Sequence, residues 1–351
     1  MRHVIALDVG GTGMKAALVA LDGGLLYEER RPLARGLGPA AVVESILRFA
    51  GDLRARGRER LGTIADAAGV AVPGLVSAEH GGIAVHSARL GRHGRRDVPL
   101  REPLRHRLDG MPVAVERSAR AAGLAEGRLG AGRGAGRFLF VSLGSAVDGV
   151  IGVGDGIEAD ARAHGHAGRI GHVVVRPGGP PCGCGRRGCL EAVASEAAVG
   201  RAWSTLCGDP SVGGAACARA VAAGDEAASR VWREAVAALA DGLIAAHTVL
   251  DLRTLVIGGG LAEAGETLLT PLRAAVEERV TFQRTPAVVR AALGDGASCL
   301  GAGLLARDLL TRTTAPRPGP VRRLPEAHGE AAGPVVPRAA VSCVGPRGRD
   351  R

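Results

Sequence analysis

Short apolar runs near the start of the chain are separated by polar and glycine positions. Residues 3–8 (HVIALD) and 16–21 (AALVAL) are each long enough for a buried strand, and a third predicted strand, 25–28, follows the turn formed by Asp22, Gly23 and Gly24. Strands joined by such short turns pair antiparallel with their neighbours. The first 28 residues therefore predict an antiparallel three-stranded meander.

Helical spacing follows the meander. Between residues 38 and 56 apolar side chains recur every three or four positions, and the same spacing returns between residues 236 and 250. This period places them on one face of a helix. Four short apolar runs bounded by glycine or proline predict buried strands: 69–72, 112–115, 138–143 and 254–257. Strands and helices alternate to about residue 310, which predicts an α/β fold.

The last part of the chain has neither pattern. From residue 315 to residue 351 proline, arginine and glycine dominate and no apolar period persists. Such a composition cannot bury enough apolar surface to offset the entropy of ordering. We therefore expect a disordered Pro/Arg-rich tail over 315–351.

Composition places the remainder among folded, cytoplasmic proteins. The 351 residues are 46% apolar, enough for sizeable cores. No segment has the charge and apolar pattern of a signal peptide, and none has about 18 consecutive apolar residues, the length of a membrane span. We expect a protein without a membrane-spanning segment that is located in the cytoplasm.

The formal net charge of +10 raises the question of nucleic-acid binding. Lys15 is the only lysine, so the basic residues are almost all arginine, a bias expected of a GC-rich coding sequence. Aromatic residues, which stack on bases, make up only 2% of the chain, and the tail carries a net charge of +4. The composition therefore disfavours a nucleic-acid partner for the folded part.

Two glycine turns are candidates for phosphate binding. The first, in 6–15 (ALDVGGTGMK), combines Asp8, Gly10, Gly11, Thr12 and Lys15 at the end of a predicted strand. Glycines let backbone N–H groups approach phosphate oxygens, and a carboxylate at this position can hold Mg²⁺. The second turn, Gly258 to Gly260, follows another predicted strand and precedes a helix start. The first turn alone is also compatible with a hairpin that binds nothing.

Three of the seven cysteines lie within eight positions of one another. His172, Cys182, Cys184 and Cys189 offer one imidazole and three thiols, the ligand set of a closed tetrahedral Zn²⁺ site. An odd number of cysteines, with the other four scattered, does not indicate a disulfide framework. We therefore predict structural zinc at these four residues.

These motifs together resemble the ROK family of sugar kinases and related repressors. The resemblance rests on DVGGTGMK, on GHVVVRPGGPPCGCGRRGCLEAVAS and on VIGGGLAEAGE, and it covers about residues 3–310. It implies an actin-like ATPase (ribonuclease H-like) fold with two α/β domains around a central cleft. The domains would span 1–115, joined by the C-terminal helix at about 300–314, and 116–300. Because the first strand begins at His3, we expect the glucokinase-like branch without the DNA-binding domain of the repressors.

The resemblance also implies site residues. ATP and Mg²⁺ would be held by the two glycine turns and by a second phosphate loop at Gly144 and Ser145. His172 and Glu191 would contact the sugar, and the zinc would shape this wall of the cleft without taking part in chemistry. A homo-oligomer is a further implication.

The sequence departs from the family at the positions that carry the reaction. Ser118 occupies the place of the aspartate that acts as general base, and a serine hydroxyl cannot accept the sugar proton at physiological pH. Three positions expected to face the sugar are arginines: Arg89, Arg117 and Arg169. In the second phosphate loop three expected glycines are replaced, by Ala146, Asp148 and Val150.

These replacements favour a pseudokinase, a sugar kinase homologue that binds a carbohydrate while its phosphoryl transfer is impaired or lost. In that case ATP and Mg²⁺ would bind poorly. The three arginines suit a sugar phosphate or sugar acid, although drift in an arginine-rich chain gives the same pattern. The alternatives are an active ATP-dependent hexose kinase, of glucokinase or N-acetylhexosamine kinase type, and a DNA-associated regulator or scaffold.

Overall fold

The N-terminal strands form the predicted meander. The computed structural model describes residues 1–11, 13–33, 38–77, 83–85, 98–157 and 167–314. Strands β1 (His3–Val9), β2 (Gly13–Ala20) and β3 (Leu25–Pro32) are antiparallel, and His3 lies opposite Ala20. Two parallel strands, β4 (Ala68–Val72) and β7 (Val113–Arg117), extend the sheet on the other side of β1. The resulting order is β3-β2-β1-β4-β7.

A second five-stranded sheet has the same layout. Its order is β10-β9-β8-β11-β12, with β8 antiparallel to β9 and parallel to β11. The strands are β8 (Arg137–Leu143), β9 (Val147–Val153), β10 (Gly156–Ile157), β11 (Thr254–Gly258) and β12 (Ala287–Arg290). A separate pair is formed by β5 (Leu75–Ser77) and β6 (Ile83–Val85). The two sheets thus repeat one topology without a repeat in the sequence.

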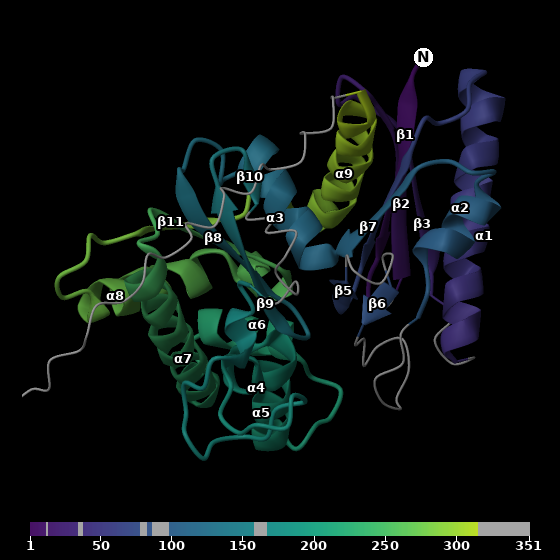
Figure 1. Ribbon diagram of the computed structural model, residues 1–351. Coiled ribbons are helices and arrows are strands. Elements are labelled where there is room, and N and C mark those ends of the chain that lie inside the picture. Colours follow the sequence, from purple (N-terminus) through teal and green to yellow (C-terminus); the bar gives the residue numbers. More distant parts are fainter. Residues whose placement is uncertain (12, 34–37, 78–82, 86–97, 158–166, 315–351) are drawn as a thin grey trace, which may run out of the picture. The chain divides into compact units, whose positions relative to one another are not determined.

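Helices cover both faces of the first sheet (Figure 1). Helix α1 (Pro39–Leu61) buries Ile46, Phe49 and Leu53 against Ile5 and Leu18, as its apolar period predicts. It runs five residues beyond the apolar period and stops where Gly62 takes a left-handed φ of 66°. Helix α2 (Arg101–Arg107) lies against β7 on this side, and α9 (Ala297–Thr314) covers β1 and β4 on the other.

Helix α9 also packs closely on α3 (Ser118–Leu129). A Cβ at Gly301 would lie 1.9 Å from the Ala121 carbonyl oxygen, so only glycine permits this approach. Helix α3 in turn contacts β8 and β9 of the second sheet. Contacts with α9 and with the second sheet therefore hold α3, which begins at Ser118, in place.

The second sheet has the larger helical cover. Its main cluster joins Leu139, Val141 and Ile257 to Leu239 and Leu243 of α7. The helices around it are η2 (Ile170–His172), α4 (Leu190–Ala194), α5 (Glu196–Cys207), α6 (Gly214–Ala222), α7 (Glu226–Leu250), η3 (Gly260–Ala264) and α8 (Glu266–Arg279). A short 3-10 turn, η4 (Gly294–Gly296), leads into α9.

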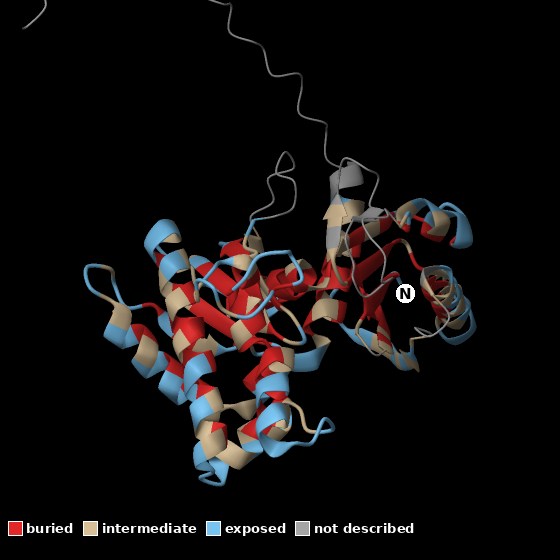
Figure 2. Ribbon diagram, turned by 90° about the horizontal axis from the view of Figure 1, so that it is seen from below, coloured by how far each residue is buried: buried red, intermediate tan, exposed pale blue. Residues whose placement is uncertain are grey.

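Burial follows this layering (Figure 2): the strands are largely buried and the outward faces of the helices are exposed. Residues Met1–Thr314 form one compact unit. The predicted boundary at 115/116 falls inside β7 and stays a prediction, and the predicted tail lies outside the described residues. Within the part that the structure describes, no helix has the length and apolar character needed to cross a membrane.

Candidate functional site

The first glycine turn has the predicted form. The Gly10 amide donates to the Gly13 carbonyl at 2.8 Å, which closes the turn between β1 and β2. Asp8 stands near the end of β1, directly opposite Lys15 on β2. Gly11 lies in the same turn, whereas Thr12 is outside the described residues.

Asp8 is a buried carboxylate at the centre of this region. It is 7% exposed and accepts a hydrogen bond from the Ser118 hydroxyl at 3.1 Å. Burial raises the pKa of Asp8 from 3.8 to about 6, although the Ser118 hydrogen bond and the charge of Lys15 act in the opposite direction. The structure therefore brings Ser118 into contact with Asp8 beside the first glycine turn, and the burial of Asp8 outweighs the effect of the Lys15 charge on its pKa.

Lys15 is held by a residue that the sequence did not indicate. Its Nζ donates to the backbone oxygen of Asp295 at 2.7 Å and forms a short ion pair with the carboxylate. Arg30 binds the same carboxylate at 2.9 Å. These cations hold the pKa of Asp295 below its usual value, with the Lys15 hydrogen bond as the main cause. A separation of 280 residues leaves no sequence signal for this pair.

The second glycine turn follows β11. Gly259 has a φ of 86°, and a Cβ there would lie 2.5 Å from the Leu143 amide nitrogen, so the turn requires glycine. Gly258 ends the strand and Gly260 begins η3. The predicted helix start is that of a 3-10 helix, and α8 begins only at Glu266.

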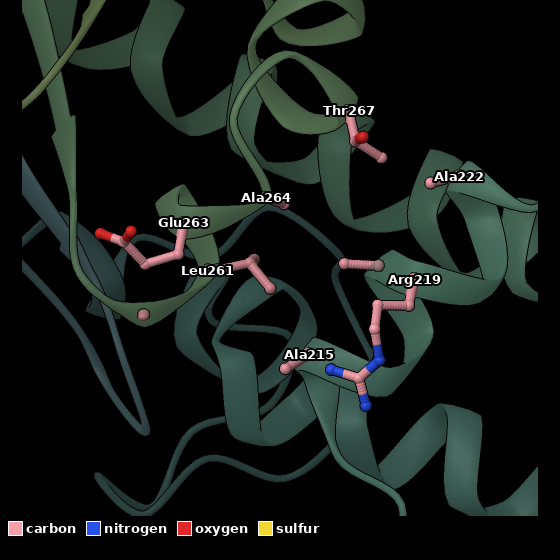
Figure 3. Close-up of a pocket in the computed structure, with 9 residues that line it drawn as sticks. Ala215, Arg219, Ala222, Leu261, Glu263, Ala264 and Thr267 are labelled. Atoms are coloured by element: carbon pink, nitrogen blue, oxygen red, sulfur yellow. The ribbon is translucent and has the colours of Figure 1, made fainter.

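A pocket of about 300 Å³ opens beside this turn. Figure 3 shows that α6 contributes Ala215, Arg219 and Ala222, while Leu261, Glu263 and Thr267 come from the segment after the turn. This volume is at the lower end of the range for small-molecule sites. Its walls combine apolar side chains with one basic and one acidic group.

The predicted second phosphate loop joins β8 to β9. The Gly144 amide donates to the Ala146 carbonyl at 3.0 Å, and the Gly144 carbonyl accepts from the Glu196 amide at 2.9 Å. Ser145 lies between them in the bend. The loop therefore exists as a tight turn next to the start of α5.

An ion pair joins β9, directly after this loop, to the last residue of β7, directly before α3; Asp148 and Val150, predicted as loop positions, are thus residues of β9. Arg117 Nη1 binds Asp148 Oδ1 at 2.9 Å, and the Arg117 side chain is only 3% exposed. Burial lowers the pKa of Arg117 and raises that of Asp148, while each charge opposes the shift of the other. The pair thus places two unexpected charges against each other. The sequence signal for it was available, because the two departures from the family pattern have opposite signs.

Three further predicted residues lie around Asp148. Arg169 Nη2 is 3.1 Å from His172 Nε2, and Glu191 Oε2 accepts from the Val147 amide at 3.1 Å. Burial lowers the pKa of His172, and the charge of Arg169 lowers it further. Arg117, Arg169, His172 and Glu191 are thus brought together, whereas Arg89 lies outside the described residues.

The four residues predicted to bind metal form one cluster. The ligand atoms of His172, Cys182, Cys184 and Cys189 all lie within 4.8 Å of one another, an arrangement that could hold a metal ion. Cys182 Sγ is 3.6 Å from His172 Nδ1, and Cys184 Sγ is 3.6 Å from Cys189 Sγ. One ring nitrogen of His172 therefore faces the thiols while the other faces Arg169.

Two sheets of one topology, with glycine turns after β1 and β11, define the class as the actin-like ATPase fold in the form found in sugar kinases. The chain belongs to the ROK family, whose sequence pattern matches residues 4–309.

Relatives in this family carry sugar kinase names. A glucokinase from Halalkalibacterium halodurans is 32% identical over 330 residues, covering 87% of this chain and 95% of that protein. An N-acetylmannosamine kinase from Yersinia pseudotuberculosis is 32% identical over 315 residues, covering 88% and 98%. The crystal structure of a ROK glucokinase from Streptomyces griseus in complex with glucose and AMPPNP is 28% identical, with a TM-score of 0.74 and coverage of 87% and 99%.

Proposed function

We propose that this ROK protein binds a carbohydrate between α3 and the metal cluster, and that its phosphoryl transfer is impaired or lost. Ser118 carries this proposal. It begins α3, at the position where the family resemblance expects the general base, and its hydroxyl donates to Asp8. Loss of a positioned base costs about 10²- to 10⁴-fold in rate.

The Arg117–Asp148 pair supports the same conclusion. In the expected active site, a small amide side chain and a glycine would leave room for sugar and phosphate at these two positions. Here a buried guanidinium and a carboxylate occupy that space and bind each other at 2.9 Å. Catalysis of phosphoryl transfer depends on positioning and on positive charge around the phosphate. A carboxylate directly after the second phosphate loop opposes both.

The metal cluster supports a structural Zn²⁺ site. Zn–S bonds of about 2.3 Å and Zn–N bonds of about 2.0–2.1 Å, at tetrahedral angles, separate two sulfurs by about 3.8 Å and sulfur from nitrogen by about 3.6 Å. Both 3.6 Å separations in the cluster are close to these values. Zinc bound here would fix the ring of His172 and the segment that leads through Cys189 to Glu191.

A role for Glu191 in sugar binding follows from its remaining acceptor capacity. One carboxylate oxygen accepts the Val147 amide, and a carboxylate has about four lone-pair sites in all. Glu191 can therefore accept hydroxyl protons of a sugar while the backbone bond holds it in place.

The donor site supports a nucleotide in principle. The pocket next to Gly260 can take the base and ribose, and Asp8 can hold Mg²⁺, which would supply the positive charge that this buried carboxylate lacks. Asp148 would weaken the phosphate contacts. We therefore expect a lower affinity for ATP and Mg²⁺ than that of an intact kinase.

One observation favours an active hexose kinase as the alternative. The Ser118 hydroxyl can accept the sugar proton while it passes its own proton to Asp8, whose pKa of about 6 suits a proton acceptor near neutral pH. Such a relay would replace the missing base with two residues, and it requires that Mg²⁺ be held by the phosphates rather than by Asp8, because a bound cation would lower the Asp8 pKa.

A coupled assay of ATP consumption over a panel of neutral hexoses separates the two functions. We expect turnover more than about a hundredfold below the usual rate of about 10 s⁻¹. Turnover within about a hundredfold of that usual rate would establish the active kinase, and Ser118→Ala should then abolish the turnover.

Restoring the base tests the assigned role of Ser118. We expect the triple variant Arg117→Asn, Ser118→Asp, Asp148→Gly to raise the rate at least tenfold, within the range given by one positioned base. The same triple variant with Asn at 118 is the matched control, because Asn has the size of Asp and accepts no proton at neutral pH. Equal rates for the two triple variants would contradict the role of position 118.

A further inference from the structure

Two hydrogen-bond donors converge beside the metal cluster. Arg169 directly precedes η2 and His172 ends it, so one turn of 3-10 helix brings Arg169 Nη2 to 3.1 Å from His172 Nε2. A guanidinium has N–H donors and no acceptor. In this contact, therefore, His172 Nε2 has to be the acceptor and its proton has to be on Nδ1.

Metal binding excludes that arrangement. Nδ1 faces Cys182 Sγ at 3.6 Å and is the nitrogen available to a metal held by the three cysteines. A neutral imidazole that binds a metal through Nδ1 carries its proton on Nε2. Nε2 then becomes a donor and no longer accepts from Arg169. With the metal in place, two donors about 3 Å apart need a common acceptor.

Arg169 has little else to bind. Within the described residues it makes no ion pair with an acidic side chain, and its Nε is buried without a partner. The neighbouring acids keep free acceptor sites but form no ion pair with Arg169: Asp148, whose charge acts on Arg169 only at longer range, accepts from Arg117 and from the Gly149 amide, and Glu191 accepts from Val147. The positive charge of Arg169 is thus directed to the same place as the Nε2 proton of His172.

The chemistry of the common acceptor follows. A single hydroxyl oxygen can accept both hydrogen bonds only weakly and leaves the charge of Arg169 unpaired. A carboxylate or phosphate offers two or more oxygens and a full negative charge, and a guanidinium binds such groups in a planar, paired geometry.

We infer that the cleft binds a sugar that carries an oxyanion, with Arg169 and the Nε2–H of His172 holding the anionic group. This rests on the proposed function, which places a carbohydrate at His172 and Glu191. Glu191 then accepts sugar hydroxyls while Arg169 selects the charge. The ligand class is therefore a sugar acid or a sugar phosphate rather than a neutral hexose.

Isothermal titration calorimetry on the zinc-loaded full chain tests the inference with two matched pairs of probes. Glucuronate is compared with glucuronamide, its neutral isostere, and glucose 6-phosphate with glucose. We expect the anion of at least one pair to bind about 10- to 100-fold more tightly, the range of a charge-assisted hydrogen bond. The pair that shows the difference identifies carboxylate or phosphate as the group.

Variants assign the preference to Arg169. Arg169→Gln should reduce the ratio of affinities in that pair to about one, whereas Arg186→Gln should leave it within about threefold of wild type. Arg186 is an exposed residue of the cysteine loop, so its substitution removes the same charge near His172 without removing the convergent donor. A preference that persists in Arg169→Gln overturns the inference.

The outcomes separate the inference from the proposed function. Equal binding of glucuronate and glucuronamide, together with equal binding of glucose and its phosphate, refutes the anionic ligand and leaves carbohydrate binding intact. No binding of any of the four probes refutes carbohydrate binding at this site and the inference with it. Should Arg169→Gln fail to fold, the wild-type comparison decides the ligand class and Arg169→Lys, which keeps the charge, should retain the preference.

Discussion

The Arg117–Asp148 ion pair gives the most direct quantitative prediction. The Arg117 and Asp148 side chains are 3% and 21% exposed, so removal of one partner leaves a charge with little access to water. Breaking a buried pair in this way costs about 3–5 kcal/mol, whereas replacing both partners is often close to neutral. The single variants Arg117→Met and Asp148→Gly should therefore be destabilised strongly, and the double variant only weakly.

The two single variants should respond differently to pH. In Arg117→Met, Asp148 can become neutral by taking up a proton. At pH 7 this costs about 4 kcal/mol for a carboxyl with an unfolded pKa near 3.9, and the cost falls by about 1.4 kcal/mol per pH unit. The destabilisation is therefore limited to about 4 kcal/mol at pH 7 and to about 1.5 kcal/mol at pH 5. In Asp148→Gly the guanidinium stays charged at both pH values, so the cost does not change.

Urea unfolding at pH 5 and pH 7, followed by circular dichroism, measures both effects. Differences from wild type at each pH remove the contribution of other titrating groups, provided that the metal content of all proteins is the same. We expect a coupling free energy of at least about 2 kcal/mol at pH 7. Additive single variants, or an Arg117→Met variant whose destabilisation is the same at both pH values, would refute the assignment of this pair as a buried, mutually dependent unit.

Three further predictions concern single groups. Asp8→Asn should stabilise the protein by up to about 3 kcal/mol at pH 7 and have little effect at pH 4. The folded pKa of about 6 destabilises the native state fully above pH 6, and this destabilisation disappears as the pH falls towards 3.8. Equal stabilisation at the two pH values in urea unfolding would contradict this prediction. Cys182→Ser should abolish metal binding and, for a loss of about 4 kcal/mol in a folded part of this size, lower Tm by about 6 °C, while Cys207→Ser, which changes an exposed thiol of α5, should alter neither. Elemental analysis and calorimetry measure both quantities, and unchanged metal content in Cys182→Ser would count against the cluster. Glu126→Ala should cost about 3 kcal/mol or more in urea unfolding, because this buried carboxylate accepts three backbone amides, and a change below about 1 kcal/mol would show that water replaces it.

Local patterns in the sequence predicted the parts of the fold that depend on near neighbours. The meander, α1, α7 and the buried strands have apolar runs or helical periods bounded by glycine and proline, and the structure confirms that they exist. Most bounds agree within about five residues, but α7 begins at Glu226, ten residues before its predicted apolar period. Helix α3 has no such signal. Most of its residues are buried because it packs against α9 and against the second sheet, so its small side chains show no polar face.

In the candidate site, too, local sequence patterns predicted some contacts, and the packing of distant elements determines the others. The cysteine cluster was predicted because its ligands lie close in sequence, and the structure brings all four together. Contacts such as Lys15 with Asp295 depend on where distant elements meet, and hydrophobic spacing carries no information about that distance. The sequence shows Arg117 and Asp148 as two separate departures from the family pattern. Their pairing depends on the packing of α3 near β9, which no local pattern predicts.

The position of α9 has a consequence for how the protein is made. Val4, Ala6, Val19 and Ala71 on the first sheet are buried by Ala302 and Ala306 of α9, which a ribosome adds more than 200 residues after the last of these strands. At about 5–20 residues per second, that face of the nascent sheet stays uncovered for about 10–50 s. Alanine and valine side chains have little apolar area, so the uncovered face of the first sheet has only a weak hydrophobic attraction for other chains. The small side chains that let α9 approach closely thus also reduce the risk of aggregation during synthesis.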